Sequence, residues 1–152
     1  MGNQLLTARK LVEEGIRVVV AEHGHYDHHK DAEIHLSRLL PPFDQATSAL
    51  HDDVMARGLN VVVVVVSEFG RTTRVNRDLG REHWPYSNSM LLFGQGIPRG
   101  EVLGAVRPNG EIFGQASALR ADYLAETFLR MLGFERVNVR TGQIFPFLNA
   151  LV

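Results

Sequence analysis

The chain contains no cysteine among its 152 residues. This absence excludes disulfide bonds and thiolate metal ligands, so any metal ion would have to be held by histidine or carboxylate side chains. Long apolar runs are also missing: the longest, residues 61–66, is far too short to cross a bilayer. Residues 1–4 do not open a basic region followed by an apolar stretch, so we expect no signal peptide in this chain. A soluble protein without a membrane partner is expected.

An excess of charge of either sign is absent too. The 16 lysine and arginine residues are balanced by 17 acidic residues, for a net charge of -1. A strongly basic surface is the usual mark of nucleic-acid binding, so we expect no nucleic-acid partner. The hydrophobic content of 45% and the charged content of 22% are those of an ordinary globular protein. The length suits a single domain, residues 1–152.

Predicted helices and strands alternate along the chain, which is an α/β pattern. Residues 61–66 are all valine, and the lack of polar alternation predicts a strand buried on both faces, as in the centre of a parallel sheet. The pair Pro41-Pro42 suits the first turn of a helix, so one helix is predicted to end before it and another to begin there. The predicted helices cover residues 4–14, 31–40, 41–57 and 118–132, the predicted strands cover residues 16–21, 61–66 and 89–93, and residues 101–105 and 111–113 are predicted to form a small hairpin.

Four of the seven histidines fall within residues 23–29, directly after the predicted strand 16–21. In an open parallel sheet, ligands bind beyond the carboxyl ends of the strands. Residues 27–29, 67–72 and 80–85 each stand next to a predicted strand, so we expect them to meet at one edge of the sheet. Histidine and carboxylate side chains are the usual ligands of a metal ion in proteins, so such an edge is a candidate metal site. A solvated polar loop is the competing interpretation.

Residues 67–87, after the valine strand, are predicted to form a long polar loop that contains Arg71, Arg74, Arg77 and Arg81. Guanidinium groups match phosphate and sulfate geometry, so the arginines of this loop could bind an anionic ester. For Arg74 and Arg77 we favour a solvated loop instead. Glu68 has three open interpretations: a metal ligand, a general base, or a carboxylate that anchors Arg71 or Arg81 by a charge-assisted hydrogen bond, of which we prefer the last.

Two motifs resemble those of a known family. Residues 67–72 (Ser-Glu-Phe-Gly-Arg-Thr), followed by residues 80–85 (Gly-Arg-Glu-His-Trp-Pro), are similar to the signature of domain of unknown function 1501. Residues 25–29 (His-Tyr-Asp-His-His) resemble that family's Gly-Trp-Asp-x-His stretch. The strand and glycines of residues 91–100 and the helix containing residues 121–123 are similar as well. The resemblance covers nearly the whole chain, in order.

That family resembles a branch of the alkaline phosphatase and sulfatase superfamily, whose members hydrolyse phosphate or sulfate esters at a metal centre. The resemblance implies a three-layer α/β/α sandwich with a mainly parallel sheet, alkaline-phosphatase-like, of which this chain is the C-terminal part. It implies Asp27, His29 and His83 as ligands of one divalent ion, zinc. It places Glu68 where the superfamily has the aspartate of an Asp-His pair that serves a second metal. We take Glu68 and Arg71 as the catalytic candidates that support the first ion, and a small anionic ester as the substrate.

Three departures from the superfamily pattern shape the prediction. Phe69 stands where the superfamily has the histidine of an Asp-His pair, so a second metal lacks a ligand. The spacing from Asp27 to His29 is shorter than usual, which leaves His28 as a competing ligand. The strand that carries the superfamily's nucleophile has no counterpart in this chain. The rival hypothesis is a non-catalytic metal-binding or oligomerising remnant, and apolar edges left by a missing half of the sheet predict a homo-oligomer.

Overall fold

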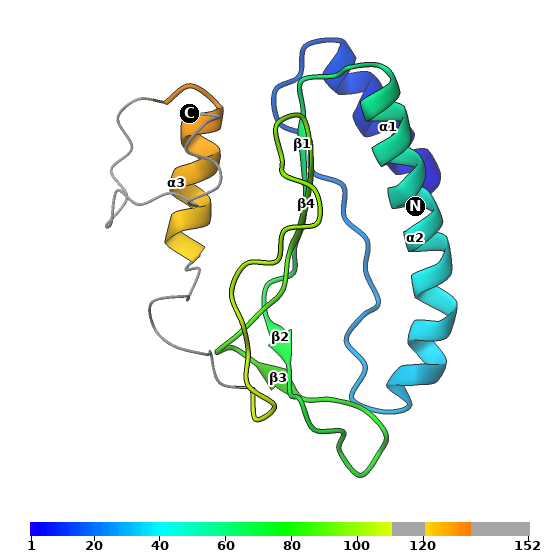
Figure 1. Cartoon of the computed structure of the whole chain (residues 1–152). Coiled ribbons are helices and arrows are strands. Elements are labelled where there is room, and N and C mark those ends of the chain that lie inside the picture. The colour runs from blue at the N-terminus through cyan, green and yellow to red at the C-terminus, as the bar shows by residue number, and fades with distance from the viewer. Residues whose placement is uncertain (111–120, 135–152) are drawn as a thin grey trace. The chain divides into compact units, whose positions relative to one another are not determined.

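The computed structural model describes residues 1–110 and 121–134 and divides the chain into two units, residues 1–95 and 96–152. The first unit consists of two helices followed by short strands (Figure 1). Its helices are α1 (Gly2–Glu13) and α2 (Ala32–Ala56), and its strands are β1 (Val62–Val65), β2 (Gly70–Arg71), β3 (His83–Trp84) and β4 (Leu91–Gly94). The described part of the second unit contains the helix α3 (Ala121–Met131).

The helices α1 and α2 lie side by side (Figure 1). Leu5 on α1 and Val54 on α2 are the buried apolar side chains of the described residues, at 9% and 2% exposure. Ion pairs join the same two helices: Asp53 lies 2.9 Å from Arg9 Nε, and Arg57 Nη1 lies 3.1 Å from Glu13. The hydrogen bond from Arg57 holds the pKa of Asp53 below its ordinary value. Buried apolar side chains and ion pairs therefore hold the helix pair together.

The helix α2 runs without interruption through Pro41 and Pro42, so the predicted division into helices 31–40 and 41–57 is wrong. Each proline lacks the N–H group that would bond to the carbonyl four residues earlier, which disfavours the helix locally. Because α2 packs against both α1 and β4, tertiary contacts stabilise it. These contacts outweigh a local preference that, taken alone, would divide the helix.

The strand β1 pairs with β4 in antiparallel orientation, with Val62 opposite Gly94 and Val65 opposite Leu91. The four valines of β1 are half-buried rather than enclosed on both faces. The predicted three-layer α/β/α sandwich with a mainly parallel sheet is therefore wrong, because the described residues contain two antiparallel sheets of two strands each. A run of valines favours extended chain, but it does not choose the direction or the number of the partner strands.

The predicted strand at residues 16–21 is not formed. This stretch leads from α1 toward α2 as irregular chain (Figure 1), and it makes no ladder with any strand of the described residues. Val18 and Val20 are 59% and 79% exposed, so the predicted burial is also wrong. A strand needs a neighbour that bonds its backbone groups, and apolar composition does not supply one.

A small hairpin within the predicted loop 67–87 positions the candidate site. The strands β2 and β3 pair in antiparallel orientation, with Gly70 opposite Trp84 and Arg71 opposite His83. Directly opposed residues of an antiparallel pair bring their side chains within contact distance. The hairpin therefore places a guanidinium group and an imidazole side by side, which the predicted irregular loop would not do.

The segment before α2 lies directly against the loop of this hairpin. Lys30 and Leu79 form an isolated antiparallel bridge. Gly80 is buried here, and a Cβ atom at its position would lie 2.1 Å from the carbonyl carbon of His29. Only glycine leaves room for two backbones at this separation. This close approach brings the histidine-rich segment to the hairpin.

In the second unit, α3 occupies most of the helix predicted for residues 118–132. Glu126 on this helix is 1% exposed and accepts a hydrogen bond from Arg130 Nε at 2.7 Å. Residues 101–105 form no strand, and the other half of the predicted hairpin, residues 111–113, lies outside the described residues. Within residues 1–110 and 121–134, no helix combines the length and the apolar character needed to cross a bilayer.

Candidate metal site

Asp27, His29 and His83 bring three potential ligand atoms together where the segment before α2 meets β3. Asp27 Oδ1 lies 2.9 Å from His83 Nε2 and 3.1 Å from His29 Nε2, and the two Nε2 atoms are 3.1 Å apart. His83 follows Asp27 by 56 positions in the chain. The convergence predicted for these residues is present, although a hairpin and a backbone bridge create it in place of a parallel sheet edge.

The size of this triangle fits a single divalent ion. Zinc binds histidine nitrogen and carboxylate oxygen at about 2.0–2.2 Å, so neighbouring ligand atoms of a tetrahedral site lie about 3.3 Å apart. The separations of 2.9 Å and 3.1 Å need only a small expansion to match that value. Three protein ligands leave one position for water or substrate. The side chain of Asp27 is 62% exposed, so that position is open to solvent.

Arg71 supplies the positive charge of this cluster. Its position opposite His83 in the β2–β3 pair brings its Nη2 atom into a hydrogen-bonded ion pair with Asp27 Oδ1. Its Nη1 atom donates to the carbonyl oxygen of Arg81 at 3.0 Å. The hydrogen bond from Arg71, and after it the one from His83, holds the pKa of Asp27 well below the usual carboxyl range. Asp27 is therefore ionised near neutral pH, as a metal ligand must be.

Phe69 forms one wall of the cluster. Its ring packs on the imidazole of His83 with the centroids 4.1 Å apart. The guanidinium carbon of Arg71 lies 5.6 Å from the centroid of the same ring, which is within the range of a cation–π contact. The sequence marks Phe69 only as a lost ligand for a second metal. In the structure this residue restricts where the neighbouring imidazole and guanidinium groups can lie.

Two residues that the sequence did not single out contact His29 on the side away from the triangle. Glu82 Oε2 lies 2.6 Å from His29 Nδ1, and Asn76 Nδ2 donates to Glu82 Oε1 at 2.6 Å. The hydrogen bond from Asn76, followed by that from His29, lowers the pKa of Glu82. The Asn-Arg-Asp run at residues 76–78 is a turn signal that could have drawn attention to Asn76. No local pattern links Glu82 with His29, since they meet only in the folded chain.

The other histidines of the N-terminal cluster have different neighbours. The ring of His28 stacks on that of His35 with the centroids 4.2 Å apart, and it takes no part in the triangle. Of the two competing ligands, the structure therefore brings His29 and not His28 to the site. His23 Nδ1 lies 2.7 Å from the hydroxyl oxygen of Tyr26.

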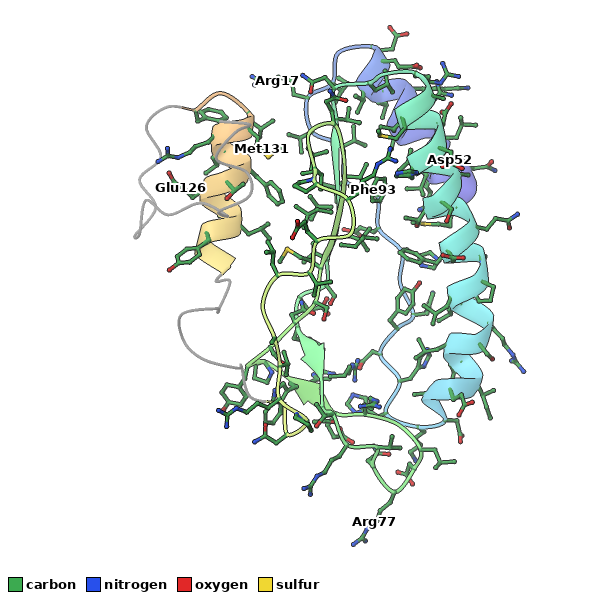
Figure 2. All side chains as sticks on the ribbon, in the orientation of Figure 1. Arg17, Asp52, Arg77, Phe93, Glu126 and Met131 are labelled. Atoms are coloured by element: carbon green, nitrogen blue, oxygen red, sulfur yellow. The ribbon has the colours of Figure 1, made fainter. Side chains whose placement is uncertain are left out.

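Glu68 is exposed and does not act as the predicted anchor. Within the part of the chain that the structure describes, it forms no ion pair with Arg71 or Arg81. Arg74 and Arg77 are exposed, and Figure 2 shows Arg77 at the tip of the loop, pointing away from it. Of the four loop arginines, the structure thus brings Arg71 alone into contact with the triangle.

Comparison with known proteins identifies the chain by family. A comparison with curated proteins and another with solved structures found no match. The model of the family described as protein of unknown function (DUF1501) matches residues 1–142, which is most of the chain. The sequence motifs at residues 25–29, 67–72 and 80–85, which supply every ligand of the triangle, fall inside that match. The chain belongs to the DUF1501 family.

Proposed function

We propose that this chain is a metal-dependent, hydrolase-like domain that acts on phosphate or sulfate esters. The observation that carries the proposal is the triangle formed by Asp27, His29 and His83, with Arg71 hydrogen-bonded to its oxygen corner. A metal ion next to an arginine is a common arrangement for charged ester groups, because both stabilise negative oxygen atoms. The cluster is exposed to solvent, so a small anionic substrate has access to it.

The donor set supports zinc as the bound ion. Two imidazole nitrogens and one carboxylate oxygen, with an open fourth position, are a ligand set that catalytic zinc uses. When bound, such an ion polarises an ester oxygen and acidifies a water molecule toward neutral pH. Asp27 would supply the anionic ligand, and His29 and His83 the neutral ones.

Arg71 would hold the anionic group of the substrate. Its side chain is 24% exposed, so part of the guanidinium group is accessible, and its fork geometry suits two oxygens of a phosphate or sulfate group. Glu68 is the second catalytic candidate. It is an exposed carboxylate next to Phe69, whose ring contacts His83, and it would accept a proton at the edge of the site.

A measurement of bound metal tests the site directly. Elemental analysis of the purified protein should find about one zinc ion per chain, and the His83→Ala variant should lose it. His25→Asn is the matched control, because His25 is an exposed histidine of the same cluster with positive φ, which asparagine tolerates. A wild-type protein that folds without metal and does not bind added zinc would contradict the proposed site.

Turnover separates hydrolysis from metal binding alone. An aryl phosphate and an aryl sulfate ester are offered in parallel to the zinc-loaded protein, with and without a chelator. Hydrolysis that the chelator abolishes and that Arg71→Gln weakens supports the proposed function. Zinc binding without turnover of either ester contradicts it and favours the second candidate.

That second candidate is a non-catalytic metal-binding module that assembles as a homo-oligomer. The exposure of Val18 and Val20 favours it, together with the fact that residues 18–21 belong to no ladder of the described strands. An exposed apolar stretch of this kind can pair with a second copy. Sedimentation velocity of the wild type and of Val20→Lys tests this: an oligomer that the substitution weakens supports assembly, and a monomer at every concentration contradicts it.

A further inference from the structure

The carboxylate of Glu82 stands behind His29 in the position that orienting groups take in metal sites. Glu82 Oε2 is 2.6 Å from His29 Nδ1, and the opposite ring nitrogen, Nε2, faces Asp27 and His83 at 3.1 Å. The two nitrogens of this imidazole therefore have separate neighbours. One contacts an acceptor that cannot donate, and the other lies in the ligand triangle.

This arrangement selects one tautomer of the His29 ring. An ionised carboxylate accepts hydrogen bonds only, so Nδ1 must carry the proton that the short contact with Glu82 requires. In the neutral ring, Nε2 then carries the lone pair that a metal ion needs. Histidine ligands of metal sites commonly use such a partner, which sets both the orientation of the ring and its basicity.

Asn76 holds the carboxylate in place. Its Nδ2 atom donates to Glu82 Oε1 at 2.6 Å and to the carbonyl oxygen of His29 at 2.9 Å. Its Oδ1 atom accepts from the backbone N–H groups of Asp78 and Gly80 at 3.0 and 2.8 Å. One side chain therefore connects the turn of the hairpin loop, the carboxylate and the backbone of the ligand segment. These hydrogen bonds hold the half-exposed carboxylate of Glu82 next to Nδ1.

We propose that Glu82 is the positioning residue of the metal site, and that it presents His29 Nε2 to the ion by fixing the tautomer and the angle of the ring, with Asn76 as its support. The inference rests on the proposed function, since it assigns a role toward the ion held by Asp27, His29 and His83. It adds a residue that contacts neither ion nor substrate. Removing it should weaken metal binding without removing a ligand.

Zinc titration against a competing chelator measures the effect in four proteins. Glu82→Ala should bind zinc about 10- to 100-fold more weakly than the wild type, the range expected when an orienting partner is lost. Glu82→Gln keeps one acceptor oxygen and should recover part of this loss. Asp78→Asn is the control: it removes an exposed carboxylate of the same loop, so a loss confined to Glu82→Ala excludes a general effect of charge.

The tautomer of His29 gives a second readout that needs no metal. Nitrogen NMR of the metal-free wild type, at a pH where the ring is neutral, should show protonated Nδ1 and unprotonated Nε2 for His29. Glu82→Ala should show a mixture of the two tautomers. The dispersion of its backbone amide signals should match that of the wild type, which shows that the variant is folded. A Glu82→Ala protein that keeps both the wild-type tautomer and the wild-type zinc affinity would overturn the inference.

The two readouts also separate this inference from the proposed function. A wild type that binds no zinc refutes the proposed metal site, and the tautomer measurement then decides the positioning role of Glu82 by itself. When the wild type binds zinc and Glu82→Ala matches it in both zinc affinity and tautomer, the positioning role is refuted and the metal site stands.

Discussion

Replacing Gly80 by alanine tests the contact that assembles the candidate site. Gly80 is buried, and its backbone φ is not in the left-handed region, so the added methyl group acts only through its volume. An ideal Cβ atom would lie 2.1 Å from both the carbonyl carbon and the carbonyl oxygen of His29, and 2.5 Å from the nitrogen of Lys30. All three atoms belong to the backbone, so no side chain can rotate to make room.

The expected size of the effect follows from these distances. Ordinary van der Waals contact of a Cβ atom begins at 3.4 Å, so the two backbones must separate by more than about 1 Å. The hydrogen bonds on either side resist this, from Asp31 N to Asp78 O at 2.9 Å and from Ala32 N to Leu79 O at 3.0 Å. Overpacking of this kind costs about 1–3 kcal/mol of unfolding free energy.

The same displacement should disable the metal site. His29 lies on one side of the contact, and His83 follows Gly80 on the other. Distances between a metal and its ligands tolerate only about ±0.2 Å, so a separation of about 1 Å should weaken zinc binding by at least about tenfold. Stability and metal affinity should therefore fall together in Gly80→Ala.

Urea unfolding and zinc titration measure the two effects. Gly24→Ala is the matched control, because nothing lies within 4 Å of a Cβ atom at that position and its φ is not in the left-handed region. The control should keep the stability and the zinc affinity of the wild type. A Gly80→Ala protein that matches the wild type in both measurements would refute the close approach of the two segments and the reasoning built on it.

Two further predictions concern charge. Arg71→Gln should tighten zinc binding about five- to tenfold, because the guanidinium group hydrogen-bonded to Asp27 Oδ1 competes with the ion for that atom and repels it by roughly 1 kcal/mol. The control variant Arg77→Gln, which changes an exposed arginine of the same loop, should keep the wild-type zinc affinity. A weaker zinc affinity in Arg71→Gln would show that Arg71 supports the ligand instead. Asp53 has a lowered pKa because Arg57 donates a hydrogen bond to it, so its contribution to stability is present above about pH 4 and disappears as the pH falls through the lowered folded-state pKa. Urea unfolding of the wild type between about pH 5 and pH 3 should show this loss, Asp53→Asn should lack that part of it, and equal losses in both proteins would contradict the assignment.

Much of the local structure was predictable because it depends on short-range patterns. Apolar residues at helical spacing in residues 4–14, followed by Gly15, predicted α1. An amphipathic stretch that ends before Gly133 predicted α3. Extended chain was correctly predicted for β1 and for most of β4, since valine, leucine and phenylalanine favour it. The candidate ligands Asp27, His29 and His83 were predictable through their motifs, with His28 as a competitor that the structure places elsewhere.

Pairing was not predictable in the same way. Residues 16–21 have a composition similar to that of β1, yet one stretch is irregular and the other forms a ladder. The strands β2 and β3 contain two residues each, which is too short for any periodic pattern to be detected. Because this hairpin sets Arg71 opposite His83, the geometry of the site depends on an element without a sequence signal.

By itself, the sequence indicated the candidate metal ligands, most of the helical chain, the extended chain of β1 and β4, and the family to which the chain belongs. Only the tertiary structure decided that the strands run antiparallel, that α2 continues through its prolines, and that Glu82 and Asn76 stand behind His29. The physical reason is the distance along the sequence over which each interaction acts. Helix and strand preferences, and the chemistry of a ligand, belong to single residues and their neighbours in the chain. Strand partners and hydrogen bonds such as that between His29 and Glu82 join residues far apart in sequence, and only the folded chain brings them together.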